Sequence, residues 1–316
     1  MEANKENTKE IEYDTIVIGT GVAGYSAAMY AARLGLKVLI IGETPGGTLA
    51  LTGKVENYPG FMSIDGQELT ELLEKHALSY NVKTITEIVD KIEKENNLFA
   101  VQAGNNAFKS KTIILATGTE VKKLGIKGEK EFFGNGVSYC ALCDSAFIKG
   151  KEAAVAGGGD AAVKEALLAV EYAKKVYIIN NEKELHPEDS HKKRLDELVQ
   201  AGKIEVINNN EILEIKGTKE IEKLILKKEF KGKKELLVQG LFVYIGQIPR
   251  SELAKILGAK LNKKGEVIVN QDCKTNIKGF FAGGDVTNRE WKQAIIAASQ
   301  GVTAAYSAYN YCRKNN

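Results

Sequence analysis

Two cysteines, Cys140 and Cys143, are separated by two residues and followed at once by Asp144. This spacing lets the two sulfur atoms meet in a short loop, where a thiolate can attack a disulfide and relay it outward. Exchange also needs a leaving thiolate to be protonated, which a neighbouring acid can do. Because the sequence has no second paired-cysteine motif and no histidine near this one, zinc binding is disfavoured. We interpret the pair as a redox switch, in preference to two unrelated buried thiols.

A glycine-rich turn, Gly19–Gly24, lies near the start of the chain between two segments that suit a nucleotide-binding fold. Residues 13–18 have the continuous apolar pattern of a buried parallel strand, and the alanine-rich residues 25–34 predict a helix. A second strand is expected at 37–41, and Glu43 follows it. In such a βαβ unit a pyrophosphate binds at the helix N-terminus, and the acid accepts hydrogen bonds from ribose hydroxyl groups. The complete unit predicts dinucleotide binding far more strongly than the glycines alone.

The same plan recurs downstream of the cysteine pair. Residues 152–156 predict a strand, Gly157–Ala162 form a second glycine-rich turn, and residues 161–174 and 176–179 predict a helix and another strand. The wide spacing of the two turns indicates duplication of a whole domain and not a short repeat.

The remaining segments predict how the two domains are joined. Strands at 99–102 and 111–115 flank a polar turn and suggest a hairpin layer, and an alanine-rich helix at 292–311 is expected to pack back on the first domain. We therefore predict the α/β class, with two Rossmann-like three-layer nucleotide-binding domains, the second inserted into the first. The first domain is expected at residues 1–120 and 247–316, and the inserted one, with the cysteine pair, at 121–246.

Composition and charge exclude several classes of protein. The net charge is only +3 and no long basic run occurs, which argues against nucleic-acid binding. The first apolar run, Ile16–Ile18, is too short for a signal peptide, and no stretch approaches the ~20 apolar residues that span a bilayer. Four cysteines in a chain of 316 residues do not make a disulfide framework, so we expect a cytoplasmic protein in which Cys273 and Cys312 are incidental or structural.

An ordered set of motifs along nearly the whole chain resembles the low-molecular-weight thioredoxin reductases of bacteria and archaea. The matching segments are Gly19–Gly24, Gly46-Gly47, Val55-Glu56-Asn57-Tyr58-Pro59-Gly60-Phe61, Ala116-Thr117-Gly118, Gly136-Val137-Ser138-Tyr139-Cys140, Gly157–Ala162, Phe242–Gly246, Gly283-Gly284-Asp285-Val286 and Gln293-Ala294. The resemblance implies a homodimeric flavoenzyme that reduces the disulfide of thioredoxin or a thioredoxin-like protein.

The resemblance also implies FAD in the first domain and a role for each cysteine. Cys143 is then the thiol that faces the flavin, Cys140 attacks the partner's disulfide, and Asp144 donates and accepts the proton. Ser145 departs from the family, which usually has glycine there. The residues expected to bind FAD are Gly19, Gly21, Val22, Ala23, Gly24, Glu43, Gly46, Gly47, Thr48, Asn57, Thr117, Gly118, Gly284, Asp285, Lys292, Gln293 and Ala294. Against this, glycines and polar residues at turns also occur without any ligand.

A second departure from the family concerns the electron donor. Members that use NADPH grip its 2′-phosphate with a basic HRRxxxR motif, whose three arginine positions correspond here to Asn181, Glu182 and His186. Losing two charge-assisted bonds costs ~3–6 kcal/mol, or ~10²–10⁴-fold in affinity, before any repulsion from Glu182. Lys183 offers only one flexible charge in compensation. The sequence therefore argues against NADPH.

Two donors then remain open. Glu182 lies where an acid binds the ribose of NADH, and the intact glycine turn is compatible with that cofactor. Alternatively, electrons come from reduced ferredoxin, as in the ferredoxin-linked branch that the sequence also resembles, and we favour this hypothesis. Six lysines could dock an acidic ferredoxin: Lys91, Lys94, Lys122, Lys123, Lys127 and Lys130. We expect most of them to be ordinary solvated surface residues. A ferredoxin–NADP reductase-like enzyme would not need the cysteine pair. A non-catalytic FAD-binding thiol redox sensor is the alternative from another class.

Overall fold

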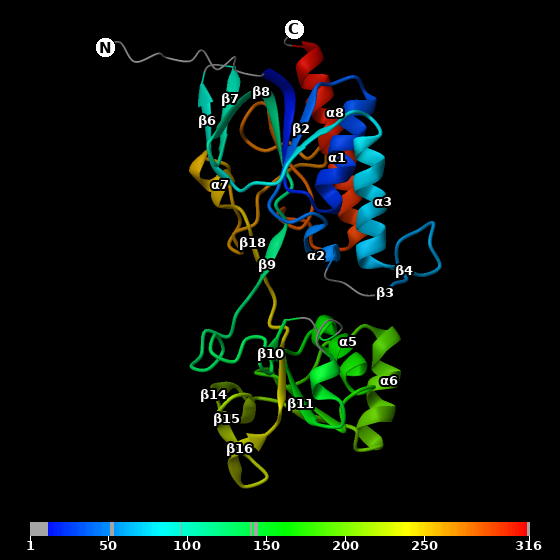
Figure 1. Cartoon of the computed structure of the whole chain (residues 1–316), viewed down its shortest axis with the longest axis vertical. Helices are drawn as coiled ribbons and strands as arrows, with labels where there is room; N and C mark the ends of the chain where they lie inside the picture. The colour runs from blue at the N-terminus through cyan, green and yellow to red at the C-terminus, as the bar shows by residue number, and fades with distance from the viewer. Residues whose placement is uncertain (1–11, 51–53, 96, 140, 142–144, 315–316) are drawn as a thin grey trace, which may run out of the picture. The chain divides into compact units, whose positions relative to one another are not determined.

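The computed structural model describes residues 12–50, 54–95, 97–139, 141 and 145–314, which form two compact units (Figure 1). Unit 1 contains the chain up to Glu120 and from Ile248 onward, and unit 2 is the segment Val121–Gln247 between them. The chain leaves unit 1 in β9 (Thr119–Val121) and returns in β18 (Gln247–Pro249), and these two strands pair with each other. The second boundary falls one residue beyond the one expected from the sequence.

The centre of unit 1 is a parallel sheet. β1 lies between β2 and β8, with Ile16 opposite both Leu39 and Ile113, and β19 pairs with the second half of β8. The strands β2 and β19 and the second halves of β1 and β8 are buried on both faces, which is why these segments read as continuous apolar runs; β5 is largely exposed. The strands are β1 (Glu12–Ile18), β2 (Val38–Ile41), β5 (Lys83–Ile85), β8 (Asn106–Leu115) and β19 (Phe280–Ala282).

The two faces of this sheet are covered differently, which gives three layers (Figure 1). On one face β6 (Val89–Glu95) and β7 (Leu98–Ala103) form an antiparallel layer with β8, and Ile16 and Ile18 pack there. On the other face Val17 belongs to a core cluster with alanines of three helices. The helices are α1 (Val22–Arg33), α3 (Gly66–Leu78) and α8 (Ala294–Lys314); shorter elements are α2 (Gly47–Ala50), β3 (Lys54–Val55), β4 (Ile64–Asp65) and α7 (Glu252–Ile256).

Unit 2 repeats the nucleotide-binding plan with a five-stranded parallel sheet in the order β10-β17-β11-β12-β13. The strands are β10 (Val137–Ser138), β11 (Glu152–Ala156), β12 (Lys175–Ile179), β13 (Ile204–Ile207) and β17 (Gly240–Val243). Helices α5 (Asp160–Ala169) and α6 (Asp189–Gln200) accompany the sheet, with a short 3₁₀ turn at Ser145–Ile148. A separate antiparallel sheet contains β14 (Ile212–Gly217), β15 (Ile221–Phe230) and β16 (Lys233–Leu237).

The helix expected at 161–174 was predicted too long. It ends at Ala169 because the next residues are tied to the start of β11: Tyr172 O accepts from Gly150 N at 2.9 Å, and Lys174 N donates to Lys151 O at 2.7 Å. The C-terminal helix packs on α1 in unit 1, as expected from its alanines. A Cβ at Gly301 would stand 2.2 Å from Ala23 O, so the two backbones approach as closely as glycine allows. No described helix is long and apolar enough to cross a membrane.

Candidate functional site

The N-terminus of α1 is built to receive an anion. Gly21 is the N-cap residue and forms no side-chain cap, and the first turn contains no acidic residue. A Cβ at Gly24 would stand 1.8 Å from Gly19 O, whereas one at Gly21 would meet nothing nearer than Gly46 O at 4.0 Å. Gly24 is therefore required for packing, and Gly21 opens a space in front of the first-turn amides of Val22 and Ala23. A pyrophosphate group fits such a space and charge.

A second loop lies against this turn and completes it. Gly46 N donates to Thr20 O at 2.8 Å, and Thr20 Oγ1 donates to Thr44 O at 2.9 Å. A Cβ on Gly47, the first residue of α2, would be 3.5 Å from Gly21 Cα, and Thr48 follows in the same helix. Glu43 is exposed just beyond the end of β2, where an acid can reach ribose hydroxyl groups.

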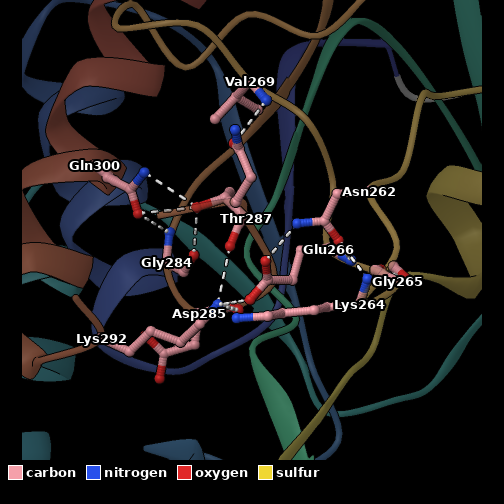
Figure 2. A network of polar contacts seen from close by, with 12 residues as sticks. Asn262, Lys264, Gly265, Glu266, Val269, Gly284, Asp285, Thr287, Lys292 and Gln300 are labelled. Atoms are coloured by element: carbon pink, nitrogen blue, oxygen red, sulfur yellow. Dashed lines mark hydrogen bonds and ion pairs between the residues drawn. The ribbon is translucent and has the colours of Figure 1, made fainter. Parts of the chain in front are cut away.

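The turn after β19 is held by a network of polar contacts (Figure 2). Gln300 is buried in α8; its Oε1 accepts from Gly284 N at 3.0 Å, and its Nε2 donates to Thr287 Oγ1 at 3.1 Å. Lys292 Nζ donates to the backbone oxygens of Asp285 at 2.6 Å and Thr287 at 2.9 Å. These contacts present the Asp285 side chain in a partly buried position, and burial raises the pKa of its carboxyl while the charge of Lys292 lowers it.

Other predicted residues are also brought together across long stretches of sequence. Asn57 Nδ2 donates to Gln293 Oε1 at 3.1 Å, just before Ala294 begins α8. Thr117 Oγ1 donates to Arg250 O at 2.7 Å, and Arg250 N donates to Gly118 O at 3.0 Å. Sequence reasoning missed the supporting residues Thr20, Arg250, Thr287 and Gln300, as well as Glu266, whose Oε1 lies 2.7 Å from Lys292 Nζ. Only Gln300 carried a sequence signal, since it is a polar residue in an alanine-rich helix.

The predicted redox residues Cys140, Cys143 and Asp144 lie outside the described residues. Ala141, between the cysteines, is described and fully buried. Cys273 and Cys312 are free and buried. Burial raises the pKa of Cys273 to about 11, with Asp272 adding to the effect and Arg289 opposing it. A thiol with so high a pKa is a poor nucleophile at neutral pH, which suits the incidental role expected for Cys273.

In unit 2 the segment in which the family's basic motif was expected follows β12. The Asn180 amide is buried and donates to Glu184 O at 2.7 Å and Asn208 Oδ1 at 3.2 Å. Glu182 Oε2 lies 2.9 Å from His186 Nε2, and both side chains are more than half exposed. The Glu182 carboxylate therefore lies at a position where NADPH use would need a phosphate-binding arginine.

The six lysines considered for docking are divided between the two units. Lys91 and Lys94 belong to unit 1, and the other four belong to unit 2. Lys91 pairs with Glu93 at 2.8 Å, Lys94 Nζ donates to Lys278 O at 2.6 Å, and Lys127 pairs with Glu214 at 2.9 Å. Half of the set is thus engaged by the chain itself.

Comparisons with known proteins show to which family the chain belongs. Residues 13–301 match the model of the pyridine nucleotide-disulphide oxidoreductase family. A thioredoxin reductase of Bacillus subtilis is 37% identical, with 96% of each chain covered.

Two solved structures are similar as well. Thioredoxin reductase of Lactococcus lactis has a TM-score of 0.89 at 35% identity, covering 96% of this chain and 99% of that one. A ferredoxin-flavin thioredoxin reductase of Clostridium acetobutylicum has a TM-score of 0.54 at 30% identity, with the same coverage. These findings confirm the resemblance, the fold class and FAD as the cofactor. The chain therefore belongs to the thioredoxin reductases of the pyridine nucleotide-disulphide oxidoreductase family, and it is an FAD-dependent thioredoxin-disulfide reductase.

Proposed function

We propose that Cys140 and Cys143 carry electrons to thioredoxin, and that reduced ferredoxin, not NADPH, is their source. FAD held in unit 1, once it has taken up two electrons from reduced ferredoxin, would supply those two electrons to the Cys140–Cys143 disulfide, which with two protons becomes a dithiol. The Cys140 thiolate then attacks one sulfur of the substrate disulfide, and the other substrate sulfur leaves as a thiolate that Asp144 protonates. The Cys143 thiolate attacks Cys140 Sγ and releases the second substrate sulfur as a thiolate, which takes up the proton that Cys143 gave up. Two electrons and two protons have then passed to the substrate, and the enzyme disulfide is restored.

Several features of unit 1 support the residues that the resemblance proposes for FAD binding. The open space at Gly21 and the uncapped first turn of α1 suit the pyrophosphate, and Glu43 suits a ribose. Asp285 lies on the turn after β19, which hydrogen bonds from Gln300 and Lys292 hold in place. Lys292, by contrast, is engaged by oxygens of its own chain, so its part is to support that turn. The other proposed residues are Gly19, Val22, Ala23, Gly24, Gly46, Gly47, Thr48, Asn57, Thr117, Gly118, Gly284, Gln293 and Ala294.

One observation carries the proposal on the donor: the Glu182 carboxylate at the end of β12. A 2′-phosphate placed there meets a negative charge where a bidentate arginine would be needed. The neighbouring Asn180 amide already donates to Glu184 O and Asn208 Oδ1, so its hydrogens are not free to bind a phosphate. Lys183 then remains the nearest basic side chain in sequence. The relative from Clostridium acetobutylicum, described as ferredoxin-flavin linked, supports the same donor for this chain.

The retained glycine turn in unit 2 does not by itself require a nucleotide. A Cβ at Gly157 would stand 2.1 Å from Tyr244 O, and one at Gly158 would stand 2.3 Å from Asn180 Oδ1. Packing within the unit therefore accounts for both glycines. Gly159 differs, because a Cβ there would meet nothing within 4 Å.

That open position, together with Glu182, favours NADH as the second candidate donor. An acid at the end of this strand can accept a hydrogen bond from the ribose 2′-hydroxyl group of NADH. In NADPH that oxygen carries a phosphate and has no proton to donate. The Glu182–His186 pair would have to open for such binding.

Anaerobic reduction of the bound flavin separates these candidates. Reduced ferredoxin should bleach the flavin absorbance, and NADPH at micromolar concentration should not, with dithionite as the control for complete reduction. Bleaching by NADPH would overturn the proposal, and bleaching by NADH alone would replace it with the second candidate. Steady turnover with thioredoxin tests that protein as the proposed electron acceptor. Sedimentation analysis of the purified holoenzyme tests the homodimer that we also propose.

A further inference from the structure

Gln300 lies where three elements of unit 1 come together, and each of them carries part of the proposed FAD site. It is buried in α8. A Cβ at Gly283, at the start of the turn after β19, would stand 3.1 Å from the Gln300 backbone carbon. A Cβ at Gly301 would stand 2.2 Å from Ala23 O in the first turn of α1, and one at Gly284 would stand 2.8 Å from Ala23 Cβ. The turn, α1 and α8 are therefore in close contact at this one position.

The Gln300 side chain closes a ring of hydrogen bonds with the turn (Figure 2). Gly284 N donates to Gln300 Oε1 at 3.0 Å, and Gln300 Nε2 donates to Thr287 Oγ1 at 3.1 Å. The Thr287 hydroxyl group donates to Gly284 O at 2.8 Å, and Thr287 N donates to the same oxygen at 3.0 Å. Gln300 thus satisfies one donor and one acceptor of the turn, which requires a side chain that has both functions.

The backbone of Gly284 explains why this support matters. Its φ of +81° lies in the left-handed region, and its amide is buried beneath the turn. A buried amide that loses its partner is costly, so without Gln300 the turn should relax until this amide finds another acceptor. Asp285 is the next residue and would move with it. The fraction of molecules with a turn that can bind FAD then falls, and the apparent affinity for FAD falls with that fraction.

We propose that Gln300 is a positioning residue that holds the Gly284–Thr287 turn against α1 and α8 and thereby sets the affinity of the enzyme for FAD. Gln300 acts through the turn and not by touching the cofactor. The inference rests on the proposed assignment of Asp285 to the FAD site. Lys292 supports the same turn through other atoms, the backbone oxygens of Asp285 and Thr287, so the role of Gln300 can be removed separately.

The test is the release of FAD from the full-length holoenzyme on serial dilution, measured as flavin in the ultrafiltrate. Gln300→Met keeps the length of the side chain and lacks both amide functions, and Thr287→Val lacks the hydroxyl group. Each should raise the dissociation constant for FAD by about tenfold. Gln239→Met is the matched control, because Gln239 Oε1 accepts from a backbone amide, Glu152 N, at 3.2 Å in unit 2. It should release FAD as the wild type does.

Gln300→Glu separates positioning by hydrogen bonds from simple packing. A neutral carboxyl group has a donor and an acceptor and can replace both amide functions, whereas a carboxylate has no donor. Burial should raise the pKa of the introduced carboxyl group. The ratio of the variant's dissociation constant to that of the wild type should therefore be near one at acid pH and rise to about tenfold or more at alkaline pH. Taking the ratio cancels the titration of Asp285, Lys292 and Glu266, which both proteins share.

Normal FAD release in both Gln300→Met and Thr287→Val would overturn the inference, as would a Gln300→Glu ratio that does not change with pH. Equal weakening in Gln239→Met would overturn it as well. If Gln300→Met does not fold, the pH series of Gln300→Glu still decides. Asp285→Asn identifies a failure at the level of the site: normal FAD release there rejects the assignment of Asp285 itself. Weakened binding in Asp285→Asn with normal binding in Gln300→Met rejects only the positioning role.

Discussion

Lys292 Nζ lies 2.7 Å from Glu266 Oε1, and this ion pair supports the turn that presents Asp285. The Glu266 side chain is 10% exposed and that of Lys292 is 25% exposed. Asn262 Nδ2 donates to the other Glu266 oxygen at 2.6 Å. Burial alone would raise the pKa of Glu266, but the hydrogen bonds from Lys292 and Asn262 outweigh it and hold the pKa below its ordinary value.

Removing the lysine should therefore destabilise the protein. Lys292→Met leaves a nearly buried carboxylate without its counter-charge, which should lower the free energy of unfolding by about 3 kcal/mol at neutral pH. Because the folded pKa of Glu266 is depressed, this contribution is present above the ordinary glutamate pKa and is lost as pH falls through the folded value. Urea unfolding at several pH values measures it. In the double variant Lys292→Met/Glu266→Gln the loss should be smaller than the sum of the single losses; strict additivity would contradict the pair.

The two nucleotide-binding units could be predicted because the sequence signals that specify them come from residues close together in the chain. Buried parallel strands give continuous apolar runs, and glycines mark the turns that need close backbone approach. The supports of the site could not be predicted in the same way. Glu266 and Lys292 are distant in sequence and meet only through the fold. The end of α5 was also missed, because the helical pattern continues to Lys174 and only tertiary hydrogen bonds to Gly150 and Lys151 stop it.

We expect the Asp285 side chain to strengthen FAD binding and to lower the stability of the apoprotein. Burial raises the pKa of its carboxyl, so the ionised form costs more free energy in the folded apoprotein than in the unfolded chain. Asp285→Asn should leave the apoprotein as stable as the wild type or more so. The same change should weaken FAD binding by about 10–100-fold, the equivalent of one charge-assisted hydrogen bond. Thermal unfolding of the apoprotein and fluorescence titration with FAD check the two halves. A variant that is less stable yet binds FAD normally would refute the assignment.

Restoring positive charge after β12 should create NADPH use. In Asn181→Arg/Glu182→Arg the repulsive carboxylate is replaced and two guanidinium groups can bind a 2′-phosphate, so the affinity for NADPH should rise by about 10²–10⁴-fold. Anaerobic flavin bleaching against NADPH concentration gives the measurement. Glu184→Arg adds charge of the same sign in the same segment and serves as the control. Equal gains in both variants would mean that general electrostatics, and not these positions, govern the donor.

Cys273 should resist alkylation in the folded protein. With a pKa raised to about 11 by burial, its thiolate fraction at pH 8 is only about 0.1%. Burial raises the pKa of Cys312 as well, with the charge of Asp14 acting in the same direction. Iodoacetamide should therefore label the reduced protein at Cys140 and Cys143 first, and labelling of Cys273 should rise steeply with pH. Mass spectrometry assigns the sites, and labelling in urea controls for intrinsic reactivity. Early labelling of Cys273 at pH 8 would disprove its sequestration.

The first glycine turn offers a matched pair of substitutions that separates folding from binding. Gly21 has φ −84°, and its Cβ would meet nothing closer than Gly46 O at 4.0 Å, so Gly21→Ala should fold normally. The added methyl group would occupy the space in front of the first-turn amides of α1, where the pyrophosphate is proposed to lie. The purified Gly21→Ala protein should therefore be stable and largely free of flavin.

Gly24→Ala should behave in the opposite way. Alanine is the better helix former, yet its Cβ would stand 1.8 Å from Gly19 O, and this backbone clash outweighs the gain in propensity. We expect a loss of about 3 kcal/mol or more in the free energy of unfolding, seen as low soluble yield or an early urea midpoint. Flavin content per folded molecule and urea unfolding, measured on both variants, separate the two effects. Flavin at wild-type levels in Gly21→Ala would mean that the pyrophosphate does not approach α1 at this glycine.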